Sequence, residues 1–114
     1  MIRKHHYKIG QEVWFYTTDT LEMHHGIVDD LEFDDEENNY IYEINTNAVP
    51  DEDDRIYHVY SSAMRANEYE AHSLFSGYLD MVTEQAEAEY HNYRELLTKE
   101  LDWMRNNEDK RPDA

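Results

Sequence analysis

Hydrophobic and polar residues follow two different periods along this chain. From Ile9 to Ala66 the apolar residues fall in short runs rich in Val, Ile, Tyr and Trp, which favour strands over helices. In the run from Tyr40 to Ile44, alternate residues face opposite sides of a strand. We therefore predict four strands and a short fifth segment, centred on residues 13–16, 26–28, 40–44, 56–60 and 63–66.

Two acidic runs, at residues 29–37 and 51–54, fall where connections between the predicted strands are needed. Asn38, Asn39 and Pro50, beside these runs, are residue types that interrupt regular structure. The pattern therefore predicts that the charge lies in loops and at strand ends.

The rest of the chain follows a helical period. Asn67, with Glu70 three residues later, is typical of a helix N-terminus, and Pro112 marks the end. Apolar residues between them recur at intervals of three or four in an eleven-residue repeat, which predicts a nearly straight helix. Gly77 is a point where a short first helix could separate from a long second one. The apolar stripe consists of Phe75, Leu79, Val82, Ala86, Tyr90, Tyr93, Leu97, Leu101 and Met104.

These patterns predict an α+β fold, in which a small bent antiparallel β-barrel of about five strands is followed by a long C-terminal α-helix. The expected organisation is a flexible N-terminal arm at 1–7, the barrel at 8–66, a helical region at 67–106 and a frayed tail at 107–114.

The length of the predicted helix bears on assembly. A continuous helix from Tyr78 to Asn106 would be about 43 Å long, longer than such a barrel is wide. The barrel would leave part of the apolar stripe uncovered, and a monomer rarely exposes such a patch. We therefore predict a homodimer that associates through the helix. The residues expected in that contact are Leu96, Leu97, Leu101, Trp103 and Met104.

Composition narrows the class of protein. The 114 residues include no cysteine, which excludes disulfides, thiolate metal sites and thiol nucleophiles. The N-terminus lacks an apolar signal segment and no run approaches the roughly 20 apolar residues that cross a bilayer, so we expect a cytoplasmic protein without a membrane partner. The net charge is −17, and residues 29–54 carry twelve acids and no base. Because 13% of the residues are aromatic, a folded and strongly anionic domain is expected.

The β portion resembles the Tudor-like and Src-homology-like small barrels. The matching segments are IGQEVWF, HGIVDDLEF, YIYEI and RIYHVYSSAMRA, which together span about residues 8–66. A barrel followed by an acidic helical region is also similar to small acidic proteins of phages and mobile elements. The resemblance implies a binding module rather than an enzyme, and it does not supply a ligand.

Aromatic residues on the predicted strands have two interpretations. Tudor-like barrels that bind methylated Lys or Arg hold the cation in a cage of aromatic faces. The competing interpretation is that alternate members of each strand form the core, because buried aromatics dominate small cores. The aromatic residues concerned are Trp14, Tyr16, Tyr40, Tyr42, Tyr57 and Tyr60.

Motifs for metal binding or catalysis are scarce. The run at 29–37 lacks the spacing and turn glycine of a calcium loop, and the four contiguous acids at 51–54 differ from nuclease carboxylates, which come from separate elements. The seven histidines show no metal-ligand spacing, and the chain has no nucleophile elbow or glycine-rich phosphate loop. We therefore predict that the protein is not an enzyme and uses no metal or other cofactor.

The remaining signal is the charge itself. Carboxylates held in register can imitate a phosphate backbone and occupy a groove lined by Lys and Arg. A charge of about 2 to 8 in magnitude usually suffices for the solubility of a small domain. We predict a strongly acidic, non-enzymatic protein-binding module that binds a basic protein and does not contact nucleic acid itself. A phage-type inhibitor that mimics nucleic acid in the basic groove of a nucleic-acid-binding enzyme or nuclease is the specific form considered, beside a generic protein-binding module. The alternatives are a Tudor-like peptide-binding adaptor and a surface that only confers solubility. The candidate partner-binding residues are Asp29, Asp30, Glu32, Asp34, Asp35, Glu36, Glu37, Asp51, Glu52, Asp53 and Asp54.

Overall fold

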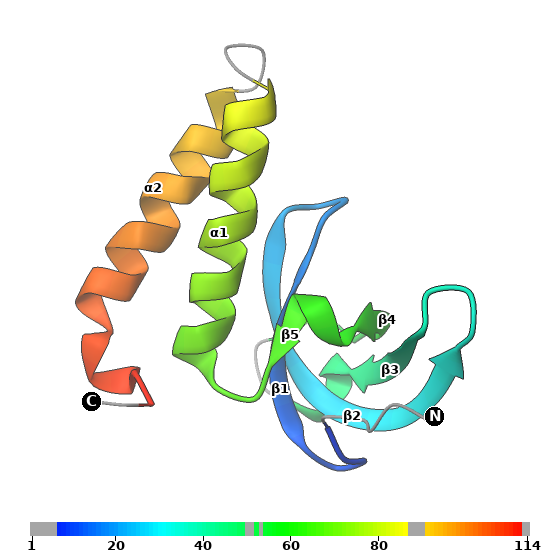
Figure 1. Cartoon of the computed structure of the whole chain (residues 1–114). Coiled ribbons are helices and arrows are strands. Elements are labelled where there is room, and N and C mark those ends of the chain that lie inside the picture. Colours follow the sequence, from blue (N-terminus) through cyan, green and yellow to red (C-terminus); the bar gives the residue numbers. More distant parts are fainter. Residues whose placement is uncertain (1–6, 50–51, 53, 87–90, 113–114) are drawn as a thin grey trace. The chain divides into compact units, whose positions relative to one another are not determined.

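The computed structural model describes residues 7–49, 52, 54–86 and 91–112 (Figure 1). The chain divides into two compact units, residues 1–66 and 67–114, which we call the sheet unit and the helical unit. The boundary falls where the strand pattern of the sequence gives way to the helical pattern.

The sheet unit contains one antiparallel sheet with the strand order β4-β3-β2-β1-β5. β4 and β5 are its two edges, and no pairing joins them among the described strands, so the predicted closure into a barrel is wrong. The physical reason is the shortness of β5, whose two residues pair only with β1. All five predicted strand segments are confirmed. The strands are β1 (Glu12–Thr17), β2 (Glu22–Asp34), β3 (Asn39–Asn45), β4 (Ile56–Tyr60) and β5 (Met64–Arg65).

The longer acidic run lies mostly in a strand, so the prediction that its charge sits in connections is wrong for its first part. β2 continues to Asp34 before the turn begins. The reason is visible in the sequence, since Asp30, Glu32 and Asp34 alternate with Leu31 and Phe33 at the period of a strand. Only residues 35–38 form the turn that leads into β3.

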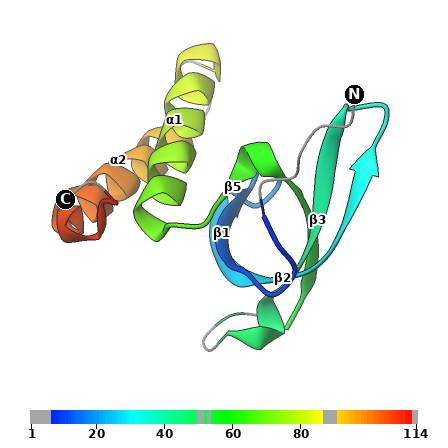
Figure 2. The same ribbon diagram turned by 60° about the horizontal axis from the view of Figure 1, so that its bottom comes forward.

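A β-bulge lies where the acidic part of β2 begins. Val28 pairs with Ile44 and Asp30 pairs with Glu43, so Asp29 is an extra residue in β2. The extra residue reverses the alternation, and even-numbered residues that face the core before the bulge face outward after it. A bulge also bends its strand, and β2 curves strongly along its length (Figures 1 and 2).

The core of the sheet unit contains residues from every strand and also Tyr7, which precedes β1. Tyr7, the last residue of the expected flexible arm, is buried, and its hydroxyl donates a hydrogen bond to the Met64 carbonyl oxygen at 3.0 Å. Its ring meets Tyr42 edge to face. The core residues are Tyr7, Val13, Phe15, Val28, Tyr42, Ile44, Val59 and Met64.

The helical unit is a pair of helices, so the predicted single long helix is wrong. α1 (Glu68–Ala86) and α2 (His91–Asn106) pack against each other, and a short 3-10 helix, η4 (Glu108–Lys110), follows (Figure 1). Apolar residues at intervals of three and four suit one straight helix and two facing helices equally well. α1 runs through Gly77 without a break, so the separation considered there is also wrong. No helix in the described part of the chain is long and apolar enough to span a membrane.

Polar contacts at the start of α1 bring the end of the chain back to it. The side-chain oxygen of Asn67 accepts a hydrogen bond from the backbone N–H of Glu70 at 3.0 Å, which confirms the predicted helix start. The Asn67 amide donates to the Lys110 carbonyl at 3.3 Å, and Lys110 Nζ lies 3.2 Å from Glu68 Oε1. Part of the segment expected as a frayed tail therefore contacts α1.

A largely buried contact between a histidine and a carboxylate joins the two helices. His72 Nδ1 in α1 lies 2.9 and 3.0 Å from the two carboxylate oxygens of Glu100 in α2. The side chains are 12% and 10% exposed, and the His72 ring stacks on Trp103 with 3.7 Å between ring centroids. The antiparallel helices are therefore held in register by a specific polar contact as well as by apolar packing.

Candidate acidic interface

The outward side chains of β2 form a row of carboxylates. Asp30 and Glu32 are exposed, and Asp34 is partly buried. Alternate residues of a strand lie about 6.7 Å apart on one face. The row is therefore a regularly spaced line of negative charge held by a backbone that is hydrogen-bonded to β3.

The neighbouring strand adds another carboxylate to this row. Glu43 in β3 lies directly opposite Asp30, and Ile41 lies opposite Glu32. On the other side of β3, Glu43 is opposite His58 in β4. A shallow cavity of about 60 Å³ is lined in part by these residues. Directly opposed like charges destabilise a sheet, so the pair of Asp30 and Glu43 opposes folding.

Asp34 has a different role from the other acids of its row. One of its carboxylate oxygens accepts hydrogen bonds from the backbone N–H groups of Glu36 at 3.0 Å and Glu37 at 3.4 Å. The other accepts a hydrogen bond from the Tyr60 hydroxyl at 2.7 Å. The Tyr60 bond, together with the two backbone bonds, lowers the pKa of Asp34, while the same bond raises the pKa of Tyr60 to about 12. Asp34 therefore fixes the turn, with its charge already engaged.

Seven carboxylates of β2, β3 and the connecting turn, all exposed except the partly buried Glu43, form what we call the acidic face. No described Lys or Arg lies within ion-pair distance of them. Glu43 was not among the predicted residues, although alternation within the predicted strand at 40–44 places it on the face of Ile41. The members of the acidic face are Asp29, Asp30, Glu32, Asp35, Glu36, Glu37 and Glu43.

The second acidic run is partly engaged within the fold. Glu52 lies 3.3 Å from His24 Nδ1 and accepts a hydrogen bond from the backbone N–H of His25 at 3.2 Å. Because His24 is buried, this carboxylate anchors its loop to β2. Of the other candidates in this run, Asp54 is exposed, whereas Asp51 and Asp53 lie outside the described residues.

The six candidate aromatics do not gather into one cage. Tyr42 is fully buried in the core. Tyr40 packs edge to face against Phe33, and Trp14 stacks on His25 with 4.4 Å between centroids. The core interpretation therefore holds for Tyr42, while Tyr40 and Trp14 are engaged with neighbouring rings.

The other three aromatics line a groove. A cavity of about 420 Å³ is bounded on one side by Tyr16 and residues 17–19, and on the other by residues 57–60 of β4, including Tyr57 and Tyr60. Ser62 and Ala63 complete the lining. Both faces of β4 contribute, so the groove follows the edge of β4 that no described strand covers.

The predicted self-association residues all lie on α2. Trp103 packs on His72 within the helical unit, and Leu101 is 47% exposed. The prediction of a homodimer rests on a single long helix that would extend beyond the barrel and expose apolar residues. The chain forms two shorter helices that pack on each other, so this argument for a dimer no longer applies. A contact between copies through Leu96, Leu97, Leu101, Trp103 and Met104 stays a prediction.

Within the described ranges, no group of three or more His, Asp or Glu residues is arranged to hold a metal ion. Comparison with known proteins adds no relative, since no family model, curated protein or solved structure matches this chain. Function is therefore inferred from the residues of the chain itself.

Proposed function

We propose that this protein is a non-enzymatic binding module whose acidic face occupies the basic groove of a nucleic-acid-handling protein. The observation that carries the proposal is the placement of Asp30 directly opposite Glu43 with no described cation within ion-pair distance. Cross-strand pairs are worth about 0.2–1 kcal/mol, and like charges act against the sheet. A partner that brings Lys and Arg to this face would turn that repulsion into attraction.

The density of charge supports imitation of a phosphate backbone. The acidic face carries seven carboxylates, six of them between residues 29 and 37 and the seventh at Glu43. The strand from Asp29 to Asp34 is about 17 Å long at roughly 3.3 Å per residue. With the turn included, the hairpin end carries about one charge per 2–3 Å, against about one per 1.7 Å of duplex DNA. A groove that contacts one side of a duplex would therefore meet a similar number of charges here.

The fold also holds the turn that carries several of these charges. The turn at residues 35–38 is tied back to β4 through the bonds of Asp34 to Glu36, Glu37 and Tyr60. A preorganised surface pays less conformational entropy on binding than a flexible acidic tail. This supports an inhibitor with a defined contact surface rather than a generic polyanion.

The test begins with capture of partners from a cell lysate and continues with displacement by short DNA duplexes at two salt concentrations. We expect the duplex to displace the protein, and we expect weaker binding at higher salt because charge attraction is screened. A variant with Asp30→Asn, Glu32→Gln, Glu36→Gln and Glu37→Gln should lose at least about tenfold in affinity.

The matched control removes four exposed acids from the helical unit instead, through Glu70→Gln, Asp80→Asn, Glu84→Gln and Glu95→Gln. Both variants carry the same net charge, so any difference between them reports where the charge lies. Equal losses in the two variants, or a duplex that fails to displace the protein, would contradict the proposal.

A second candidate function is peptide binding in the groove beside β4. The observation that favours it is the cavity of about 420 Å³ lined by Tyr16, Tyr57 and Tyr60 along an unpaired strand edge. An extended peptide could add a strand there, and a basic side chain of the peptide could contact the aromatic side chains that line the groove. Tyr16→Ala would abolish such binding and leave binding through the acidic face unchanged, so this variant separates the two functions.

A further inference from the structure

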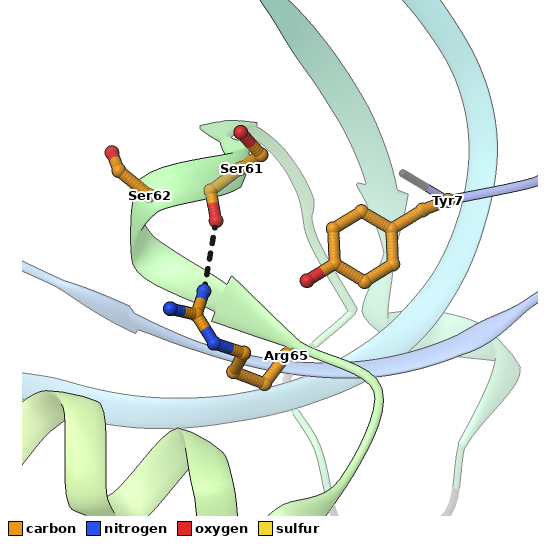
Figure 3. A pocket seen from close by; sticks show the side chains of 4 residues that line it. All are labelled: Tyr7, Ser61, Ser62 and Arg65. Carbon is orange, nitrogen blue, oxygen red and sulfur yellow. Dashed lines mark hydrogen bonds between the residues drawn. The ribbon is translucent and has the colours of Figure 1, made fainter. Parts of the chain in front are cut away.

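Arg65 lines a polar pocket in the sheet unit that shares no residue with the acidic face. The pocket has a volume of about 390 Å³ and is lined by Tyr7, Ser61, Ser62 and Arg65 (Figure 3). The Tyr7 ring lies across the opening from the Arg65 guanidinium, and its hydroxyl points toward the arginine side. Ser61 and Ser62 belong to the 3-10 helix η2 (Ser61–Ala63), which connects β4 to β5.

Backbone carbonyls hold the guanidinium in place. Arg65 Nη1 donates to the carbonyl oxygen of Met64 at 2.7 Å and to that of Ser61 at 3.2 Å. The Tyr7 hydroxyl donates to the same Met64 carbonyl at 3.0 Å. The arginine head is therefore oriented by its own turn before any ligand arrives.

The charge of Arg65 is not matched within the described residues. No described carboxylate lies within ion-pair distance of it, although the chain has 27 acids and only 10 Lys and Arg residues. Its Nε and Nη2 atoms donate to no described residue, and the Ser62 hydroxyl likewise makes no hydrogen bond there. In such an acidic protein, a partly buried arginine that pairs with no carboxylate of the described residues is suited to bind an external anion.

We propose that this pocket binds the carboxylate group of a small organic acid. Nε and Nη2 form the planar fork of N–H donors that matches a carboxylate with two parallel hydrogen bonds, and Ser62 supplies a further donor. A phosphate offers the same oxygens, but its second negative charge would be repelled by the field of a protein with net charge −17. The volume lies in the lower part of the range of small-molecule sites, about 300–1,000 Å³.

The test is an NMR titration of the whole chain with sodium acetate at constant ionic strength, followed at the Arg65 Nε–H signal and, so that variants at position 65 can be compared, at the backbone amide signals of Ser61, Ser62 and residue 65. We expect a saturable shift with acetate and a weaker response to inorganic phosphate. Arg65→Lys keeps the charge but loses the fork, so affinity should fall about tenfold. Arg94→Gln, which removes an exposed arginine from the helical unit, is the matched control and should leave the titration unchanged.

Arg65→Lys could weaken binding by disturbing the turn that Arg65 contacts, so Ser62→Asp provides a second, independent test. It places a carboxylate of the chain itself at the pocket, so the protein should stay folded and stop responding to acetate. A linear shift, a response that survives Ser62→Asp, or tighter binding of phosphate than of acetate would overturn the assignment of a carboxylate site.

Discussion

Two glycines should respond to the same substitution with opposite signs, because one lies in the core and the other in open space. A Cβ added to Gly26 in β2 would lie 2.6 Å from Ile44 Cγ2 and 3.0 Å from the Asn45 carbonyl oxygen. Carbon atoms normally pack about 3.5–4.0 Å apart, so the Ile44 methyl would have to retreat by about 1 Å. Ile44 is fully buried, which leaves it no free space to enter. A Cβ at Gly77 in α1 would meet nothing within 4 Å.

The magnitudes follow from these distances. Overpacking at Gly26 costs about 1–3 kcal/mol, and the removal of a strand glycine offsets about 0.5–1 kcal/mol of it, so Gly26→Ala should destabilise the sheet unit by about 1 kcal/mol at the centre of these ranges. Gly77→Ala should stabilise the helical unit by about 1 kcal/mol. With an m-value of about 1 kcal/mol/M, the urea midpoint should fall by about 1 M in Gly26→Ala and rise by about 1 M in Gly77→Ala.

The two tryptophans allow each unit to be followed separately. Trp14 lies in the sheet unit and Trp103 in the helical unit, and the chain contains no other tryptophan. The assay is urea unfolding monitored at the two indole N–H signals by NMR. The packing argument would be refuted by a Gly26→Ala midpoint that is unchanged or raised at the Trp14 signal. The prediction for Gly77 would be refuted if Gly77→Ala lowered the urea midpoint measured at the Trp103 signal.

Three further predictions concern other contacts. Because the pKa of Asp34 is lowered in the folded state, its contribution to stability is complete above its ordinary pKa and is lost as the pH falls through the lowered value. Because the pKa of Tyr60 is raised, its contribution is complete below pH 10 and is lost as the pH rises toward 12. Tyr60→Phe should flatten both limbs of a urea-midpoint profile against pH, and an unaltered profile would contradict the contact. His72→Leu should destabilise the helical unit by about 2 kcal/mol because the buried Glu100 carboxylate loses its partner, while adding Glu100→Leu should recover most of that loss in a double-mutant cycle. If α2 mediates self-association, sedimentation at high micromolar concentration should show a dimer that Leu101→Glu converts to monomer, and a wild-type monomer would rule this out.

The sequence by itself determined the local elements and the placement of charge. β-branched and aromatic runs marked the first four strands, and the side chain of Asn67 marked the start of α1, because strand propensity and helix capping depend on nearby residues. The segment at 63–66 has no such run, and its sequence is compatible with either a short strand or a turn. The concentration of acids between residues 29 and 54 was also evident without a structure. The alternation of acidic and apolar residues from Asp30 to Asp34 also indicates a strand, but the extra residue Asp29 shifts it out of phase with the alternation before Val28.

Only the tertiary structure decided which of these acids are free. Asp34 and Glu52 look like their neighbours in sequence, but their partners, Tyr60 and His24, lie 26 and 28 residues away along the chain. The open sheet and the paired helices likewise depend on which distant segments meet. A hydrophobic period states only that a face must be buried, and it is equally satisfied by a closed or open sheet and by one helix or two. The choice between them belongs to long-range packing, which no local pattern encodes.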